Sequence, residues 1–129
     1  MRSSPLASVK KQRDFKRVFA CKKSAASSLF VVYACANDLG NSRLGLSVSK
    51  KVGGAIARNR IKRLVREACR LIFAQKAEQG VAQAVGQAQQ GFDIVVIARP
   101  PAATLPRDIA FTKTRDTLTQ LLTRLQVLL

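Results

Sequence analysis

The side chains of this sequence that could take part in chemistry are mainly cations. The chain has no histidine, which excludes a His-dependent triad, a ribonuclease-type acid/base pair and the commonest zinc ligand. Its seven carboxylates are scattered singly, which argues against a two-metal nuclease site. Cys21, Cys35 and Cys69 lack CxxC spacing, so we expect small buried side chains in a reducing compartment rather than a zinc knuckle or a disulfide framework. We therefore expect the catalytic groups of any reaction to come from a partner.

The densest group of cations lies in residues 57–70, which read ARNRIKRLVREACR. On a helix, Arg58, Lys62, Arg66 and Arg70 follow one another at i+4 steps with no carboxylate between them on that line. Like charges at this spacing repel, and an ordinary solvated face mixes signs, so the pattern favours a phosphate-binding face over plain solvation. The planar guanidinium suits bidentate phosphate contacts. The other side of the helix is apolar and should face a core, because it carries Ile61, Leu64, Val65, Ala68 and Ile72.

The turn before this helix offers a second place for a phosphate. Lys50, Lys51, Gly53 and Gly54 bring two cations and two unencumbered backbone segments to the helix N-terminus, where amide groups point outward. A plain strand-to-helix turn explains the same residues equally well. On the helix itself, Asn59 can add directional hydrogen bonds to sugar or base edges.

Three of the few aromatic residues, Phe15, Phe19 and Tyr33, lie among basic residues rather than in the most apolar runs. Aromatic faces next to cations are typical of a surface that binds single-stranded nucleic acid, because bases stack on the rings while the cations follow the backbone. The alternative is a core contact between the first helix and the first strand. Spacing alone favours that core contact.

The overall composition also indicates a polyanionic partner. The chain of 129 residues carries a net charge of +16, and 47% of its residues are hydrophobic, so we expect one folded domain, 1–129, whose self-repulsion a polyanion offsets. Nucleic acid fits this better than a membrane, because no apolar run is long enough to span a bilayer. The start of the chain lacks the apolar segment of a secretory signal, and Asp14 argues against a transit peptide, so we expect a cytoplasmic protein.

Hydrophobic periodicity predicts the elements that must position these residues. Strict alternation in RLGLSVSKK places Gly45 and serines on one face of a strand, which leaves room for a neighbour to approach closely. We expect that strand to form a hairpin with the strand before it. The Gln/Ala/Gly segment at about 75–91 predicts a frayed helix end and a flexible surface loop. Together the pattern predicts an α+β sandwich, in which helices beginning near 14, 57 and 108 pack on strands at 29–38, 43–51 and 92–100.

The motifs KQRDFKRVFA, FVVYA, RLGLSVSKKVGGAIARNRIKRLVREACR and DIVVIARP, in this order, closely resemble the bacterial ribonuclease P protein component. The resemblance covers residues 9–125, and its most specific part is Arg58-Asn59-Arg60. It implies the small subunit of a ribonucleoprotein endoribonuclease, whose RNA carries the active site and removes the 5′ leader from precursor tRNA. It also implies a small mixed sheet with packed helices and a left-handed βαβ crossover, although connection rules favour the opposite hand.

The same resemblance assigns roles to the candidate residues. The partners it implies are the ribonuclease P RNA, bound 1:1, and the precursor-tRNA leader, with Mg²⁺ held mainly by the RNA and no catalytic or metal-binding residue on this chain. It moves the aromatic residues from core contact to leader platform. The implied leader-binding residues are Phe15, Phe19 and Tyr33, and the implied contacts to the catalytic RNA are Arg58, Asn59, Arg60, Lys62, Arg63, Arg66, Arg70, Lys50 and Lys51.

Two other functions are compatible with a basic domain of this size. One is an RNA chaperone or ribosome-associated RNA-binding protein with no link to cleavage. The other is a self-sufficient protein nuclease, which the lack of histidine and of clustered carboxylates disfavours.

Overall fold

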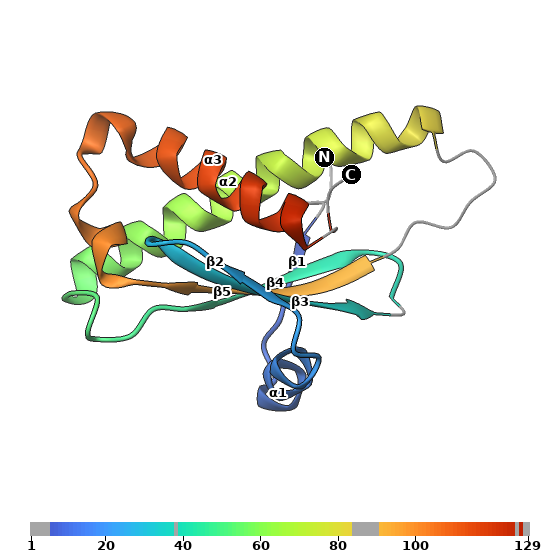
Figure 1. Ribbon diagram of the computed structural model, residues 1–129, viewed down its shortest axis with the longest axis horizontal. Coiled ribbons are helices and arrows are strands. Elements are labelled where there is room, and N and C mark those ends of the chain that lie inside the picture. Colours follow the sequence, from blue (N-terminus) through green and yellow to red (C-terminus); the bar gives the residue numbers. More distant parts are fainter. Residues whose placement is uncertain (1–5, 38, 84–90, 126, 128–129) are drawn as a thin grey trace.

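The computed structural model of the chain describes residues 6–37, 39–83, 91–125 and 127, without the side chains of 76–83. Three helices and five strands form a single layered unit, as the sequence predicted for an α+β sandwich (Figure 1). In chain order the elements are β1 (Leu6–Ser8), α1 (Gln12–Ala20), β2 (Ser24–Ala26), β3 (Phe30–Asn37), β4 (Ser42–Ser47), α2 (Ala55–Gln83), β5 (Gly91–Ala98), the 3-10 helix η1 (Pro100–Thr104) and α3 (Arg107–Arg124).

The sheet has the strand order β1-β4-β5-β3-β2. The central position predicted for the strand at 92–100 is confirmed, since β5 pairs antiparallel with β3 and parallel with β4. The expected hairpin between β3 and β4 is therefore wrong. The run Ile94, Val95 and Val96 is buried on both faces, so β5 takes the interior position and separates the two strands. Gly91, the first residue of β5, packs closely against the β3–β4 connection. A Cβ at this position would lie 2.5 Å from the backbone oxygen of Asn41, so a side chain does not fit there.

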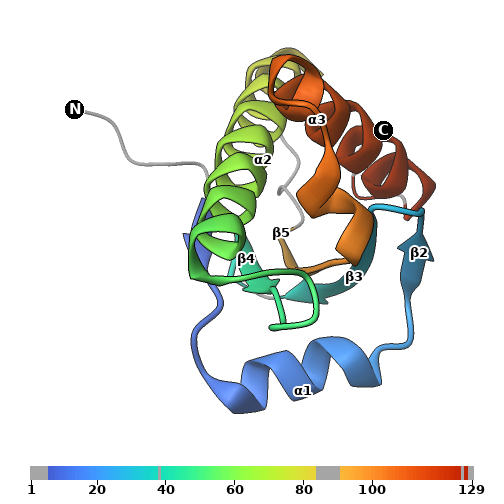
Figure 2. The same cartoon turned by 90° about the vertical axis from the view of Figure 1, so that its left-hand side faces the viewer.

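The connection from β4 through α2 to β5 is left-handed. Figure 2 shows these strands pointing toward the reader, with the chain leaving β4, passing back above the sheet along α2 and returning in β5 on the right. Most crossovers between parallel strands have the opposite hand, because of strand twist. The hand implied by the family resemblance is therefore confirmed.

The two faces of the sheet are covered unequally. Helices α2 and α3 pack on one face and α1 lies alone on the other (Figure 1). The apolar stripe predicted for the basic helix faces the larger core, where Ile61, Val65, Ala68 and Ile72 are buried, while Leu64 is only partly buried. On the other face, Val18 of α1 is fully buried against Cys35 and Val95. Within the described segments, one short helix therefore covers that face.

Helix α2 is longer than the sequence pattern indicated. It continues to Gln83 and extends beyond the sheet (Figure 1), so the first part of the Gln/Ala/Gly segment is helical. The rest of the predicted loop, 84–90, lies outside the described residues. Alanine and glutamine favour a helix, and their propensity outweighs the cost of Gly80.

The N-terminal segment contains a strand that its pattern did not predict. Leu6–Ser8 pairs parallel with β4, and the Val9 amide continues the ladder by donating to the Leu44 carbonyl at 3.0 Å. Strand β2 and helix η1 were not predicted either. All three are three to five residues long, which is too short for periodicity to stand out.

Candidate nucleic-acid interface

A basic groove of about 510 Å³ lies between α2 and the edge strand β1. Asn59, Lys62, Arg63 and Arg66 line it from the outer face of the helix, and with Arg70 they bring five of the predicted RNA contacts together. Leu6 and Leu44 supply apolar parts of the opposite wall. A groove with cations along one side and an open, partly apolar floor can hold a phosphate backbone and admit parts of the sugars.

Arg58 and Arg60, which flank Asn59 in the motif, do not line this groove. The Arg58 Nε donates to the Gly53 carbonyl at 3.1 Å, within the turn that precedes the helix. The Arg60 Nη2 donates to the Ala103 carbonyl at 3.2 Å and so ties α2 to η1. Both side chains are partly buried, and each leaves other donors of its guanidinium to a partner. They hold the start of α2 in place as well as adding charge near it.

The other predicted RNA contacts differ in their surroundings. Arg70 lines the groove but is paired with Glu67, with its Nη2 2.6 Å from the Glu67 Oε2. The pattern overlooked this pair because the two residues are three apart rather than four. Lys50 and Lys51 are exposed in the turn between β4 and α2 and do not line this groove.

The three aromatic residues lie together on the opposite face of the sheet, around α1. The rings of Phe19 and Tyr33 meet edge to face, with centroids 4.9 Å apart and planes at 85°. Phe19 is 38% exposed. Phe15 covers Gly45, since a Cβ on that glycine would lie 2.7 Å from the ring, and this confirms that the small face of β4 admits a close neighbour. Phe15 is therefore mainly a packing residue, while Phe19 presents an exposed ring.

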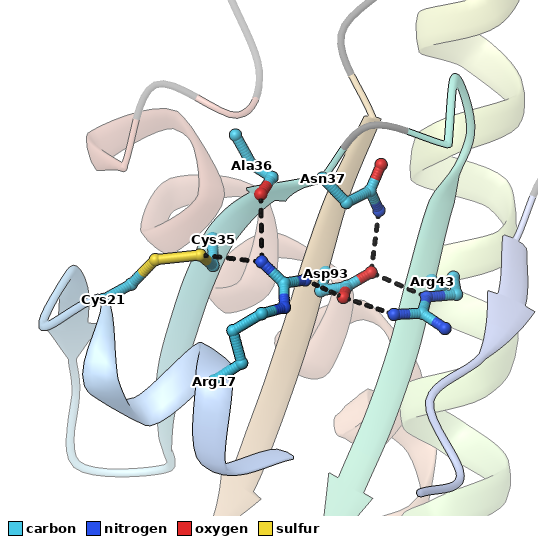
Figure 3. The surroundings of a disulfide bond; sticks show 7 residues. All are labelled: Arg17, Cys21, Cys35, Ala36, Asn37, Arg43 and Asp93. Carbon is cyan, nitrogen blue, oxygen red and sulfur yellow. Dashed lines mark hydrogen bonds and ion pairs between the residues drawn. A yellow bond between two sulfur atoms is a disulfide. The ribbon is translucent and has the colours of Figure 1, made fainter. Parts of the chain in front are cut away.

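A buried carboxylate anchors α1 to this face. Asp93 of β5 has no exposed side-chain surface, and its Oδ1 accepts from the Arg43 Nε at 2.8 Å and the Asn37 Nδ2 at 2.7 Å. Its Oδ2 accepts from the Arg43 Nη2 at 2.6 Å and from the Arg17 Nη2 (Figure 3). Burial would raise the pKa of Asp93, but the hydrogen bonds from Arg43, Asn37 and Arg17 and the Arg43 charge outweigh it and lower that pKa.

Sequence reasoning missed this cluster. A lone Asp in the apolar run FDIVVIA was the available signal, because a buried charge requires partners. The partners come from three other elements, so spacing along the chain could not identify them.

A second groove, of about 570 Å³, opens beside the Asp93 cluster. It is lined by cations from the segment before α1 and from α1 itself, and Ser8 of β1 lines both this groove and the first. The two grooves therefore meet at the β1 edge of the sheet. Arg43 of β4 also lines this groove, and its other cations all lie in the sequence KKQRDFKR, which was the available signal: Lys10, Lys11, Arg13 and Arg17.

Two of the cysteines contradict the expectation of buried free thiols. Cys21, just after α1, is exposed and forms a disulfide with Cys35 of β3 (Figure 3). Fourteen positions separate them in sequence, so CxxC spacing could not reveal the pair. Cys69 is the expected buried thiol, and burial raises its pKa to about 12.

The described residues contain no cluster of three or more Cys, Asp or Glu that could hold a metal ion. Asp93 and Glu67 are hydrogen-bonded to arginines, and Asp14 lies 3.6 Å from Arg43. This part of the chain therefore does not fit a resident divalent cation. Among the helices of the described segments, none is long and apolar enough to cross a membrane.

Comparison with known proteins decides the family. The Ribonuclease P family model matches residues 4–126. The chain belongs to the ribonuclease P protein family. The ribonuclease P protein component of Exiguobacterium sibiricum is 44% identical over 98 residues, which span 75% of this chain and 74% of that protein. That of Shouchella clausii is 40% identical over 121 residues, spanning 93% and 86%.

Solved structures agree with this assignment. The Staphylococcus aureus RNase P protein superposes with a TM-score of 0.75 at 32% identity, covering 99% of this chain and all of that one. The Thermotoga maritima RNase P protein gives a TM-score of 0.67 at 35% identity, covering 91% and 96%. The chain is thus an RNA-binding subunit of ribonuclease P, which acts in tRNA 5′ processing by RNA catalysis. A chaperone or ribosomal role is not favoured.

Proposed function

We propose that this ribonuclease P protein binds two RNAs on opposite faces of one sheet. The catalytic RNA lies in the groove between α2 and β1, and the single-stranded 5′ leader of precursor tRNA lies on the α1 face. The observation that carries this division is the position of α1 alone below the sheet, with α2 on the other side (Figure 1).

The α2 groove suits a structured RNA. Lys62, Arg63 and Arg66 project from one rigid helix, so their charges have fixed spacing, and Asn59 adds a directional donor and acceptor. Recognition by shape and phosphates is what a folded RNA requires. Arg70 joins this set once its pair with Glu67 opens, and Arg58, Arg60, Lys50 and Lys51 add charge around the start of the helix.

The α1 face suits a single strand. Phe19 and Tyr33 offer ring surface for stacking, and Phe15 holds α1 against β4 behind them. The cations of the second groove continue this surface toward the β1 edge, where a phosphate backbone can follow them. Stacking with little base-edge readout accommodates leaders of many sequences.

We assign the Mg²⁺ of the reaction to the RNA. Asp14, which lines the second groove, lies 3.6 Å from Arg43, and the buried Asp93 beside the groove is hydrogen-bonded to arginines, so the described residues offer no ligand set of their own. When bound by the RNA, the metal would supply the activated water of hydrolysis. The protein's part is to position the substrate and to neutralise phosphate charge.

We further propose one protein per catalytic RNA and a cytoplasmic location. Each chain has one α2 groove and one α1 surface, which suffices for one RNA and one leader. The location is supported by the partners, since both RNAs are made in the bacterial cytoplasm.

The division is tested by reconstituting the holoenzyme and measuring precursor-tRNA cleavage at low magnesium with matched variants. Arg66→Ala should raise the protein concentration needed to saturate the catalytic RNA. Phe19→Ala should leave that concentration unchanged and raise the KM for precursor tRNA. Both should leave mature-tRNA affinity unchanged.

The opposite pattern, with Arg66→Ala acting on the KM alone and Phe19→Ala on assembly alone, would reverse the assignment of the faces. Cleavage by protein without RNA would contradict RNA catalysis. Equal loss of precursor and mature tRNA binding in Phe19→Ala would remove the leader from the α1 face.

A further inference from the structure

Cys21 and Cys35 join the end of α1 to the second strand from the sheet edge. Their Cα atoms are 5.8 Å apart, within the usual range for a disulfide. Cys21 is exposed, whereas Cys35 is 6% exposed and packs with Val18 and Val95 under α1. Cys21 is therefore the solvent-facing member of the pair, and Cys35 is the buried member.

The covalent link lies directly beside the aromatic pair. Phe19 lies two residues before Cys21 at the end of α1, and Tyr33 lies two residues before Cys35 on β3. The ring contact and the disulfide thus connect the same two segments, with 4.9 Å between ring centroids. Opening the disulfide leaves the ring contact and the burial of Val18 to hold the end of α1.

A cation lies next to the sulfur of Cys35. The Arg17 Nη1 lies 3.4 Å from the Cys35 Sγ and also donates to the Ala36 carbonyl at 3.3 Å (Figure 3). Arg17 shares Asp93 with Arg43, which also lies 3.6 Å from Asp14, so the cation next to the sulfur is the Arg17 guanidinium itself. A cation near a cysteine promotes the thiolate, which is the nucleophile in disulfide exchange. Cys69 is buried in the main core, where burial raises the pKa of its thiol.

We propose that Cys21 and Cys35 form a thiol–disulfide exchange site for low-molecular-weight disulfides, and that its oxidised form fixes α1 for leader binding. The effect on the leader rests on the proposed function of the α1 face. The exchange chemistry does not. Disulfides in a reducing cytoplasm are usually transient or redox-sensing, which matches a pair with one exposed member.

The exchange conserves atoms and electrons. The Cys21 thiolate attacks one sulfur of a disulfide such as oxidised glutathione, forms a mixed disulfide and releases one glutathione thiolate. The Cys35 thiolate then attacks the Cys21 sulfur and releases the second. Two electrons pass from the cysteine pair to glutathione, and the two cysteine protons end on the released thiolates. Excess reduced glutathione reverses both steps.

The first test counts thiols in the full-length protein. After incubation with oxidised glutathione, alkylation in denaturant should label Cys69 alone, and the intact mass should be two hydrogens below that of the reduced protein. After incubation with dithiothreitol, all three cysteines should be labelled. Alkylation of Cys21 and Cys35 after oxidation, or a stable glutathione adduct on Cys21, would overturn the exchange site.

The second test measures precursor and mature tRNA affinity of the reconstituted holoenzyme in oxidised and reduced form. The oxidised form should bind precursor tRNA roughly two- to tenfold more tightly, the range expected from ordering a side chain before binding. Mature tRNA should show no difference. Cys21→Ser should behave like the reduced protein in both buffers, and Cys69→Ala should keep the full redox response.

Equal precursor affinity in the two forms would refute the coupling to the leader. Failure of the proposed function is distinguishable, because Phe19→Ala in the Cys21→Ser background would then leave precursor affinity unchanged as well. If Phe19→Ala weakens precursor binding while oxidation does not, the leader surface stands and the redox coupling falls.

Discussion

The buried carboxylate of Asp93 makes a sharp prediction about what holds α1 on the sheet. In Asp93→Asn, one of the two carboxylate oxygens becomes an NH₂ group, which must face donors from Arg43 and either Arg17 or Asn37. The variant loses the negative charge and two acceptor contacts without any change in volume. The two guanidinium groups remain, now without their counter-charge.

The magnitude follows from the burial of the three charges. Removing one partner of a fully buried ion pair costs about 3–5 kcal/mol. The Asp93 side chain is fully buried, but those of Arg17 and Arg43 are 42% and 20% exposed and regain water when the pair is broken. We therefore expect the free energy of unfolding to fall by about 2–3 kcal/mol, below the fully buried case.

Urea unfolding at neutral pH, with the same phosphate concentration for every variant, measures this loss in the free energy of unfolding. Asp116→Asn is the matched control, because Asp116 pairs with Arg115 at 3.5 Å on the exposed side of α3 and should change the unfolding free energy by less than about 1 kcal/mol. Equal losses for the two variants would refute the argument that the Asp93 cluster anchors α1.

The same reasoning fixes the pH dependence. The folded-state pKa of Asp93 is lowered, so its contribution to stability is present above the unfolded-state pKa, near 3.9, and is lost as the pH falls through the folded-state value. The difference in unfolding free energy between the native protein and Asp93→Asn should therefore be constant near neutral pH and shrink below about pH 4. A difference that grows on acidification would contradict this sign.

Three further changes test the rest of the interface. Arg63→Ala should weaken binding to the catalytic RNA and reduce the slope of log affinity against log salt concentration by roughly 0.7–0.9 units per lost phosphate contact. Arg70→Ala should have a smaller effect, because Glu67 already offsets the charge of Arg70. Filter binding across a salt series compares the two variants. Arg60→Ala should lower the unfolding free energy by about 0.5–1.5 kcal/mol through the lost bond to Ala103, which Arg63→Ala should not do. Gly45→Ala should cost about 1–3 kcal/mol by displacing Phe15, whereas Gly54→Ala should be nearly neutral in thermal melts, because an added Cβ there meets no atom within 4 Å.

Periodicity predicted the long elements of the fold but not their neighbours in the sheet. The stripe of Ile61, Val65 and Ala68 identified α2, and the apolar run in β5 identified the central strand. The hairpin prediction failed because short connections usually join paired strands, and nothing local in β3 or β4 shows that β5 will enter between them.

The candidate site was predicted unevenly for a similar reason. Charge spacing along α2 identified Lys62 and Arg66, because these residues share one helix face. It could not separate them from Arg60, whose side chain turns to a carbonyl 43 positions away. The Asp93 cluster and the Cys21–Cys35 bond depend on contacts between distant segments, which no local pattern encodes.

The insertion of β5 between β3 and β4 has a consequence for how the chain folds during synthesis. The ribosome completes β3, β4 and α2 before it makes residues 91–98, yet those residues form the middle of the sheet. Until they emerge, β3 and β4 cannot occupy their final positions, and pairing them directly would produce a register that must later open. The apolar side of α2 stays uncovered over the same interval. Folding is therefore delayed until the last third of the chain has emerged, and the non-local pairing makes it slow.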